Sequence, residues 1–165
     1  MTKKNLLNKD EEIAVLLHDI RSTHNVGSIF RTSDVLGVNK IYLSGYTPTP
    51  IDKYNRARKD IAKVALGAEK DISWEYTNDP KIIIKKLKKE GYQVVAIEQD
   101  KKSLDYKKIK IKKPVLFVVG NEVDGVEKSI LSLCDTIAEI PMRGNKESLN
   151  VSVAFGIALA RILNL

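Results

Sequence analysis

The chain has 165 residues, of which 43% are hydrophobic and 6% aromatic, and its formal net charge is +7. This composition indicates one soluble globular domain with an ordinary core. No apolar run approaches the roughly 20 residues that span a bilayer, which excludes a membrane-spanning protein. The opening segment MTKKNLLNKDEE has no apolar stretch, so we expect no signal peptide and a cytoplasmic location.

Two residue types limit the chemistry. Cys134 is the only cysteine, which excludes an intrachain disulfide framework and fits a reducing compartment. Only two histidines occur, His18 and His24, so we expect no metal site.

The positive charge is concentrated in residues 85–89 and 101–113. These lysines form either a solvated surface or a face that contacts phosphates, where cations release counterions and supply affinity for nucleic acid. A membrane surface is not the expected partner.

Apolar runs alternate with helical patterns along the chain. Strands are predicted over residues 13–17, 40–43, 92–97, 115–119 and 136–140. Helices are predicted over residues 26–36, 79–89, 124–133 and 149–163. This alternation predicts an α/β fold, a mostly parallel sheet with helices on both faces.

Helix-capping residues and two loop segments complete this outline. We expect Asn25 to cap the helix over residues 26–36 and Gly37 to end it. Residues 45–54 form a proline-bearing loop, and residues 56–63 form a charged, exposed segment. Composition does not shift along the chain, so residues 1–165 form a single domain. Within it, residues 1–12 are a flexible or loosely packed lead.

The C-terminal run MRGNKESLNVSVAFGIALARIL is apolar or small almost all round from Val151 onward. We therefore expect a buried helix rather than an amphipathic one. Its polar start, which includes Ser148 and Asn150, has two interpretations. Ser148 is simply an N-cap with Glu147 favouring the helix dipole, or the helix start holds a ligand.

The segment 120–125 (GNEVDG) follows a predicted buried strand, where α/β proteins place ligands. It lacks the Gly-Lys-Ser/Thr of a phosphate loop, and no dinucleotide fingerprint occurs in the chain. Gly120 and Gly125 permit close backbone approach, and Glu122 can accept hydrogen bonds from a ligand or a neighbouring backbone. The alternative is an ordinary strand-to-helix turn with Asp124 as cap.

The segment 24–34 (HNVGSIFRTSD) overlaps the helix predicted over residues 26–36, whose apolar stripe includes Val26, Ile29 and Phe30. At 100° per residue, Arg31 falls away from that stripe. It is therefore either an exposed surface arginine or a residue that a second chain brings into a site.

These three segments, in this order, resemble the three motifs of the SpoU (TrmH-like) RNA ribose methyltransferases of the SPOUT superfamily. The resemblance covers the chain from about Ile13 to its end. It implies a SPOUT-type fold with a C-terminal trefoil knot, although unknotted chains are the general rule. It also implies binding of S-adenosyl-L-methionine next to residues of three strand ends and the last loop: Ile97, Gly120, Ile140, Met142, Ser148 and Leu149.

The resemblance further implies methyl transfer to a ribose 2′-hydroxyl of tRNA or rRNA by a homodimer. The implied catalytic residues are Arg31, Asn25, Glu122, Ser148 and Asn150. Arg31 acts either as a base or as an electrostatic stabiliser, and we favour the second role because a guanidinium holds its proton tightly. The alternative function is a non-catalytic RNA-binding or assembly protein that keeps the same fold.

Overall fold

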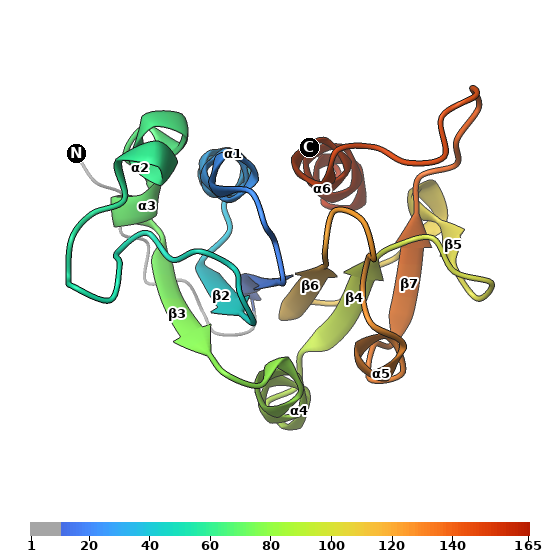
Figure 1. Ribbon diagram of the computed structural model, residues 1–165. Helices are drawn as coiled ribbons and strands as arrows, with labels where there is room; N and C mark the ends of the chain where they lie inside the picture. The colour runs from blue at the N-terminus through green and yellow to red at the C-terminus, as the bar shows by residue number, and fades with distance from the viewer. Residues whose placement is uncertain (1–10) are drawn as a thin grey trace.

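A computed structural model describes residues 11–165 and shows a seven-stranded sheet in the order β3-β2-β1-β6-β4-β7-β5 (Figure 1). All neighbouring strands pair in parallel. The strands are β1 (Ile13–His18), β2 (Lys40–Ser44), β3 (Ser73–Thr77), β4 (Gln93–Ile97), β5 (Leu104–Asp105), β6 (Val115–Val119) and β7 (Thr136–Glu139).

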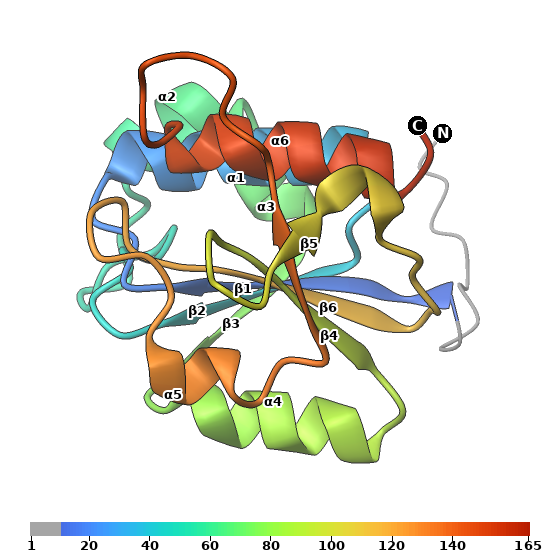
Figure 2. The same cartoon turned by 90° about the vertical axis from the view of Figure 1, so that its right-hand side faces the viewer.

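Helices cover both faces of this sheet (Figure 2). One face carries α1 (Thr23–Val35), α2 (Lys59–Ala65), α3 (Ala68–Asp71) and α6 (Val151–Ile162). The opposite face carries α4 (Pro80–Lys89) and α5 (Lys128–Leu131), and a short 3-10 helix, η2 (Tyr106–Lys108), follows β5. The predicted α/β class, with a mostly parallel sheet and helices on both faces, is confirmed.

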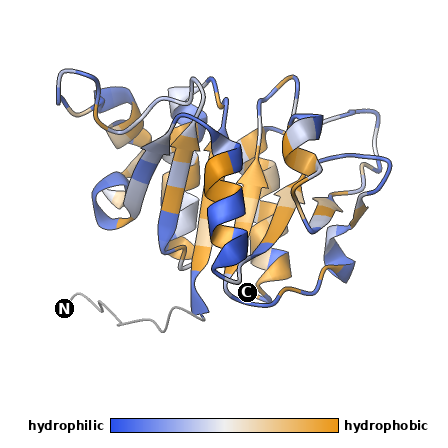
Figure 3. Ribbon diagram, turned by 90° about the horizontal axis from the view of Figure 1, so that it is seen from below, coloured by the Kyte–Doolittle hydropathy of each residue, from blue (hydrophilic) through white to orange (hydrophobic). Residues whose placement is uncertain are grey.

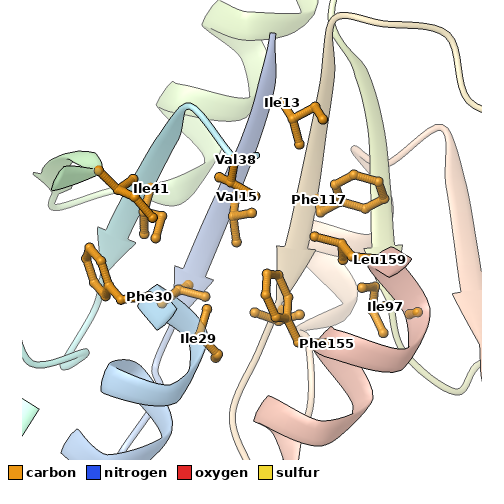
Figure 4. Close-up of a cluster of buried hydrophobic side chains, with 14 of the residues drawn as sticks. Ile13, Val15, Ile29, Phe30, Val38, Ile41, Ile97, Phe117, Phe155 and Leu159 are labelled. Atoms are coloured by element: carbon orange, nitrogen blue, oxygen red, sulfur yellow. The ribbon is translucent and has the colours of Figure 1, made fainter. Parts of the chain in front are cut away.

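Two hydrophobic clusters form the core, one on each face of the sheet. Alternate residues of β1 enter different clusters, because side chains along a strand point to opposite faces. Phe30, Phe117 and Phe155 are fully buried in the cluster beneath α1 and α6 (Figure 4). The central strands are hydrophobic along most of their length, as expected for parallel strands covered on both sides (Figure 3).

The five predicted strands all exist, with bounds within one residue of the prediction. The sequence did not predict β3, β5, α2 or α3. β3 lies at the edge of the sheet and its residues are mostly exposed, so its sequence SWEYT carries no apolar run. The segment 56–63, predicted to be exposed, includes the start of α2, where Ile61 is fully buried.

The predicted cap of α1 is wrong, and so is the interpretation of Ser148 as the cap of the last helix. Ser22, not Asn25, caps α1 by accepting a hydrogen bond from the Asn25 N–H, and Asn25 is buried in the first turn. Asn150, not Ser148, caps α6. In both cases an earlier or later polar residue reaches the free N–H groups with better geometry. Gly37 follows the end of α1 with a positive φ of 73°, as predicted.

Two predicted helices also differ in the structure. Instead of a helix over residues 124–133, only Lys128–Leu131 is α-helical, because Asn121 and Gly125 bond to each other in a tight turn. α6 was expected to be buried all round, yet Val153 and Ile157 are 47% and 41% exposed. One side of α6 packs against α1 and the sheet, and Val153 and Ile157 on its other side are not covered by any of the residues 11–165.

Some predictions lie beyond this description. The predicted lead, residues 1–12, falls mostly outside the described residues, and the knot stays an implication of the resemblance. In the part of the chain that is described, no helix is both long enough and apolar enough to cross a membrane.

Candidate functional site

A cavity of about 410 Å³ lies where β4, β6 and β7 end, against the segment that leads into α6. This is the edge at which parallel α/β sheets bind ligands, and the volume suits a small organic molecule. All six residues predicted to bind a cofactor line it: Ile97, Gly120, Ile140, Met142, Ser148 and Leu149. The structure thus brings together positions that are up to 52 residues apart in the chain.

The charge of this cavity restricts its ligand. Its lining among the described residues includes five acidic residues and no lysine or arginine; the acidic ones are Glu98, Glu122, Asp124, Glu139 and Glu147. Carboxylates disfavour a phosphate-rich nucleotide and favour a ligand with positive charge. S-adenosylmethionine carries a sulfonium and an ammonium group, so the residues present fit this cofactor.

Two glycines shape the wall of the cavity. A Cβ atom at Gly120 would lie 2.4 Å from the carbonyl oxygen of Gly125, which a folded backbone cannot accommodate. Gly125 has a φ of 71°, and a side chain there would meet the carboxylate of Glu98. Glycine at both positions therefore lets the loop after β6 fold tightly against the end of β4.

Glu122 joins this loop to the start of α1. Its carboxylate accepts hydrogen bonds from the N–H groups of Arg21 (2.9 Å) and Ser22 (3.1 Å) and from the side-chain amide of Asn25 (2.9 Å). Partial burial disfavours the charged form, but these three donors outweigh burial and lower the pKa of Glu122 below its ordinary value. Both oxygens of the ionised carboxylate accept hydrogen bonds from protein donors. Glu122 therefore fixes the loop after β6 to the start of α1.

The network continues from α1 to α6. Asn150 donates from Nδ2 to the Oδ1 atom of Asn25 at 3.0 Å. The Oδ1 atom of Asn150 accepts from the Ser152 N–H (2.9 Å), from the Ser152 hydroxyl (2.6 Å) and from the Val153 N–H (3.4 Å). Three of the five predicted catalytic residues, Glu122, Asn25 and Asn150, therefore form one continuous hydrogen-bonded chain.

The other two predicted catalytic residues stand apart from that chain. Ser148 lines the cavity and is exposed. Arg31 is exposed on α1, does not line the cavity, and has no hydrogen bond or salt bridge within residues 11–165. Within this single chain, Arg31 is thus available to contact RNA or a second chain.

Asn121 is a site residue that the sequence did not single out. Its side-chain amide donates to the Asp19 carbonyl (3.0 Å) and to the Tyr46 hydroxyl (2.6 Å), while its Oδ1 accepts from the N–H groups of Val123 and Asp124. It therefore holds the cavity loop against the loop after β2. Its position next to Glu122 in the sequence could have marked Asn121 as a site residue. No sequence feature near Tyr46 predicted the hydrogen bond between Tyr46 and Asn121.

One cluster in the described residues has the donor types of a metal site. The Nε2 atom of His18 lies 3.2 Å from Asp19 Oδ2 and 3.6 Å from Glu127 Oε1, and its Nδ1 lies 2.8 Å from the hydroxyl of Ser44. These distances suit a histidine–carboxylate ion pair as well as a metal ion. We assign no metal to it, and the predicted absence of a metal stays a prediction.

Together, an all-parallel sheet, an acidic cavity at its carboxyl edge and a helix α6 linked to α1 are the features of a ligand-binding α/β domain. A family model, the SpoU rRNA Methylase family, matches residues 12–160. The chain belongs to this family, and the predicted resemblance is confirmed.

Named relatives agree with this assignment. The chain is 32% identical over 155 residues to a tRNA (guanosine(18)-2'-O)-methyltransferase of Aquifex aeolicus, covering 92% of this chain and 68% of the relative. It is 32% identical to the 23S rRNA (guanosine-2'-O-)-methyltransferase RlmB of Pseudomonas aeruginosa, covering 96% of this chain and 62% of that protein.

A solved structure with the same fold is an AdoMet-bound rRNA methyltransferase from Sinorhizobium meliloti. It has a TM-score of 0.85 and 31% identity, and the match covers 96% of this chain and 58% of that one. The chain thus spans between about half and two thirds of the length of these relatives.

Proposed function

We propose that this protein transfers a methyl group from S-adenosylmethionine to a ribose 2′-hydroxyl of tRNA or rRNA. Family membership, the named relatives and the acidic cavity support this function. The observation that carries it is the hydrogen-bonded chain of Glu122, Asn25 and Asn150, which runs from the cavity wall to the start of α6. Because its proposed substrate is tRNA or rRNA, we propose a cytoplasmic location.

The cofactor supplies an electrophilic methyl group, and the chain's own residues supply position and charge. Glu122 holds the cavity loop and the start of α1 in register, and we assign it a positioning role. Ser148, at the cavity, and Asn150, at the start of α6, orient the ribose. Alignment of the reacting atoms then accounts for much of the rate.

Arg31 is proposed to bind the phosphate next to the target ribose and to stabilise negative charge on the 2′-oxygen as its proton passes to solvent water. Its exposed guanidinium has no partner within residues 11–165, so it is available for that contact. A guanidinium also matches the geometry of phosphate oxygens better than an ammonium does.

A homodimer would bring Arg31 to a site. α1 and α6 lie side by side, with Gly156 against Thr32, and their outer surface exposes Val35 (77%), Val153 (47%) and Ile157 (41%). Apolar surface of this kind marks interaction sites, and two-fold dimers are the commonest homo-oligomers. We propose that two chains pair through this surface and that Arg31 serves the cavity of the partner.

The test is methyl transfer from labelled S-adenosylmethionine to total RNA that lacks this modification, followed by mapping of ribose methylation. Incorporation at a single ribose 2′-oxygen is the expected result. The net charge of +7 favours a second candidate, a non-catalytic RNA-binding protein. RNA binding without either cofactor binding or methyl transfer would establish that candidate instead.

A further inference from the structure

A second hollow, of about 630 Å³, lies beside the end of β2 and is separate from the cofactor cavity. The loop after β2 forms one wall and two residues of β3, Trp74 and Tyr76, form the other. We call it the aromatic–basic groove. Its lining is Gly45, Tyr46, Thr47, Pro48, Thr49, Ile51, Asp52, Lys53, Tyr54, Arg58, Trp74 and Tyr76.

The loop that builds this groove is a hairpin held by several hydrogen bonds. Ile51 and Ala57 form an antiparallel bridge, and the Arg58 N–H donates to the Pro50 carbonyl at 2.9 Å. Asp52 closes the turn: its carboxylate accepts from the N–H groups of Tyr54 and Arg56, both at 2.9 Å, and pairs with the Arg56 guanidinium. A preformed wall lowers the entropy lost when a ligand binds.

Three tyrosines are exposed at the groove although aromatic rings are usually covered. Tyr46 is 58% exposed, Tyr54 is 65% exposed and Tyr76 is 43% exposed. The Nζ atom of Lys53 lies 5.0 Å from the centre of the Tyr54 ring, and the Arg56 guanidinium carbon lies 4.9 Å from it. Aromatic rings flanked by cations are the surface on which proteins stack unpaired nucleotide bases.

The groove also carries unneutralised positive charge. Within residues 11–165, neither Lys53 nor Arg58 has a carboxylate within salt-bridge distance. The Nε atom of Arg58 is buried and has no hydrogen-bond partner among those residues. The rest of the Arg58 side chain lines the groove, and a phosphate oxygen there would find a charged donor in its guanidinium.

One hydrogen bond connects the groove to the proposed active site. The Tyr46 hydroxyl accepts from Asn121 Nδ2 at 2.6 Å, and Asn121 lines the cofactor cavity beside Glu122. Tyr46 therefore stands between the two hollows. A strand of RNA whose ribose lies at the cavity can continue directly across this residue.

We propose that the aromatic–basic groove binds unpaired nucleotides of the substrate RNA next to the methylated ribose. Tyr46 and Tyr54 stack on bases, while Lys53 and Arg58 contact phosphates. The inference rests on the proposed function and adds to it that the substrate is single-stranded near the target.

Trp74 makes the proposal directly measurable, because it is the only tryptophan of the chain and it lines the groove. A single-stranded oligoribonucleotide of about ten nucleotides, long enough for such sites, should quench its fluorescence. A duplex of the same sequence should quench it far less, since paired bases cannot stack on protein rings. S-adenosylmethionine alone should leave this signal unchanged.

Tyr54→Ala should weaken oligonucleotide binding about 5- to 100-fold, the range expected for loss of one base–aromatic stack. Tyr54→Phe should bind as the wild type does, because the ring remains. Ile82→Ala is the matched control: this exposed residue of α4 lies on the opposite face of the sheet. In methyl transfer, Tyr54→Ala should raise KM for RNA and leave kcat at saturating RNA nearly unchanged.

Equal quenching by heparin, a polyanion without bases, would overturn the stacking role. Unchanged RNA affinity in Tyr54→Ala would refute RNA binding in the aromatic–basic groove, and the proposed function would be unaffected. Failure of the proposed function is distinct, because the wild-type protein would then neither bind S-adenosylmethionine nor methylate RNA. Ultraviolet cross-linking to bromouridine RNA gives an independent check, with cross-links expected at Tyr46 or Tyr54 and none at Tyr92, which is buried.

Discussion

Asn150 and Asn25 are 125 residues apart in the chain, and their side-chain amides form a hydrogen bond of 3.0 Å. The same Asn150 side chain caps α6, and the same Asn25 side chain donates to Glu122. This pair therefore couples the position of α6 to the loop that lines the proposed cofactor cavity.

Asn150→Ala should lower both stability and activity. The variant loses the cap of α6, which costs about 0.5–2 kcal/mol of unfolding free energy, and it releases Asn25. Urea unfolding measures the first effect and methyl transfer the second. Ser148→Ala is the control, since Ser148 does not cap the helix: it should lose activity at unchanged stability. An Asn150→Ala protein as stable as the wild type would contradict the capping role.

Glu122 should make stability depend on pH in the acid range. Its pKa in the folded protein is lowered, despite partial burial, by the donors of Arg21, Asn25 and Ser22. The ionised carboxylate therefore contributes its stability fully above the unfolded pKa of 4.5, and this contribution is lost as the pH falls through the folded value. Glu122→Gln should be less stable than the wild type at pH 7, and the difference should shrink below pH 4.5. A difference independent of pH would refute this coupling.

Arg31→Ala should abolish methyl transfer while the melting temperature and the affinity for S-adenosylmethionine stay nearly unchanged. The reason is that Arg31 is exposed and lies outside the cavity lining. Arg31→Lys should also be poor, because an ammonium cannot reproduce the guanidinium fork. Lys63→Ala, an exposed cation on α2, serves as control and should retain activity. Wild-type turnover in Arg31→Ala would remove this residue from the mechanism.

The protein should be a two-fold dimer that buries more than about 1,000 Å². Ile157→Glu places a charge in the exposed apolar stripe of α6 and should yield monomers near 18.5 kDa by light scattering, with loss of activity. Ile82→Glu, on the opposite face, should remain dimeric. An active wild-type preparation with the monomer mass would decide against the dimer.

Mixed dimers test whether two chains share one site. In a heterodimer of Arg31→Ala and Asn150→Ala subunits, one of the two sites would receive both an intact Arg31 and an intact Asn150. Activity should therefore rise above that of either parent variant on mixing. If mixing restores nothing although heterodimers form, each site is built from a single chain.

Cofactor binding should need no metal. S-adenosylmethionine at about 100 times its dissociation constant adds roughly 2.7 kcal/mol to the unfolding free energy, so the melting temperature should rise. A chelator should leave both the rise and the calorimetric affinity unchanged. In Gly120→Ala, S-adenosylmethionine should no longer raise the melting temperature, because the added Cβ would displace the cavity loop. Absence of calorimetric binding to the wild type would leave the RNA-binding candidate standing.

Local patterns in the sequence determined five of the seven strands and the class of fold. The strands β1, β4 and β6 are buried on both faces, so their apolar runs were visible without tertiary context. Family motifs then marked Gly120, Ile140 and Ser148, which line one cavity in the structure. β3 escaped prediction because an edge strand with exposed residues needs its neighbour β2 to form.

Only the tertiary structure decided which polar residues act on one another. Asn25 reads locally as a helix cap, yet Ser22 takes that position and frees the Asn25 amide for Glu122 and Asn150. Likewise, the contact between Tyr46 and Asn121 joins loops 75 residues apart. Hydrogen bonds between such distant groups depend on the order of the strands in the sheet. Sequence periodicity predicts which face of an element a residue occupies, but it does not predict which distant residue that side chain contacts.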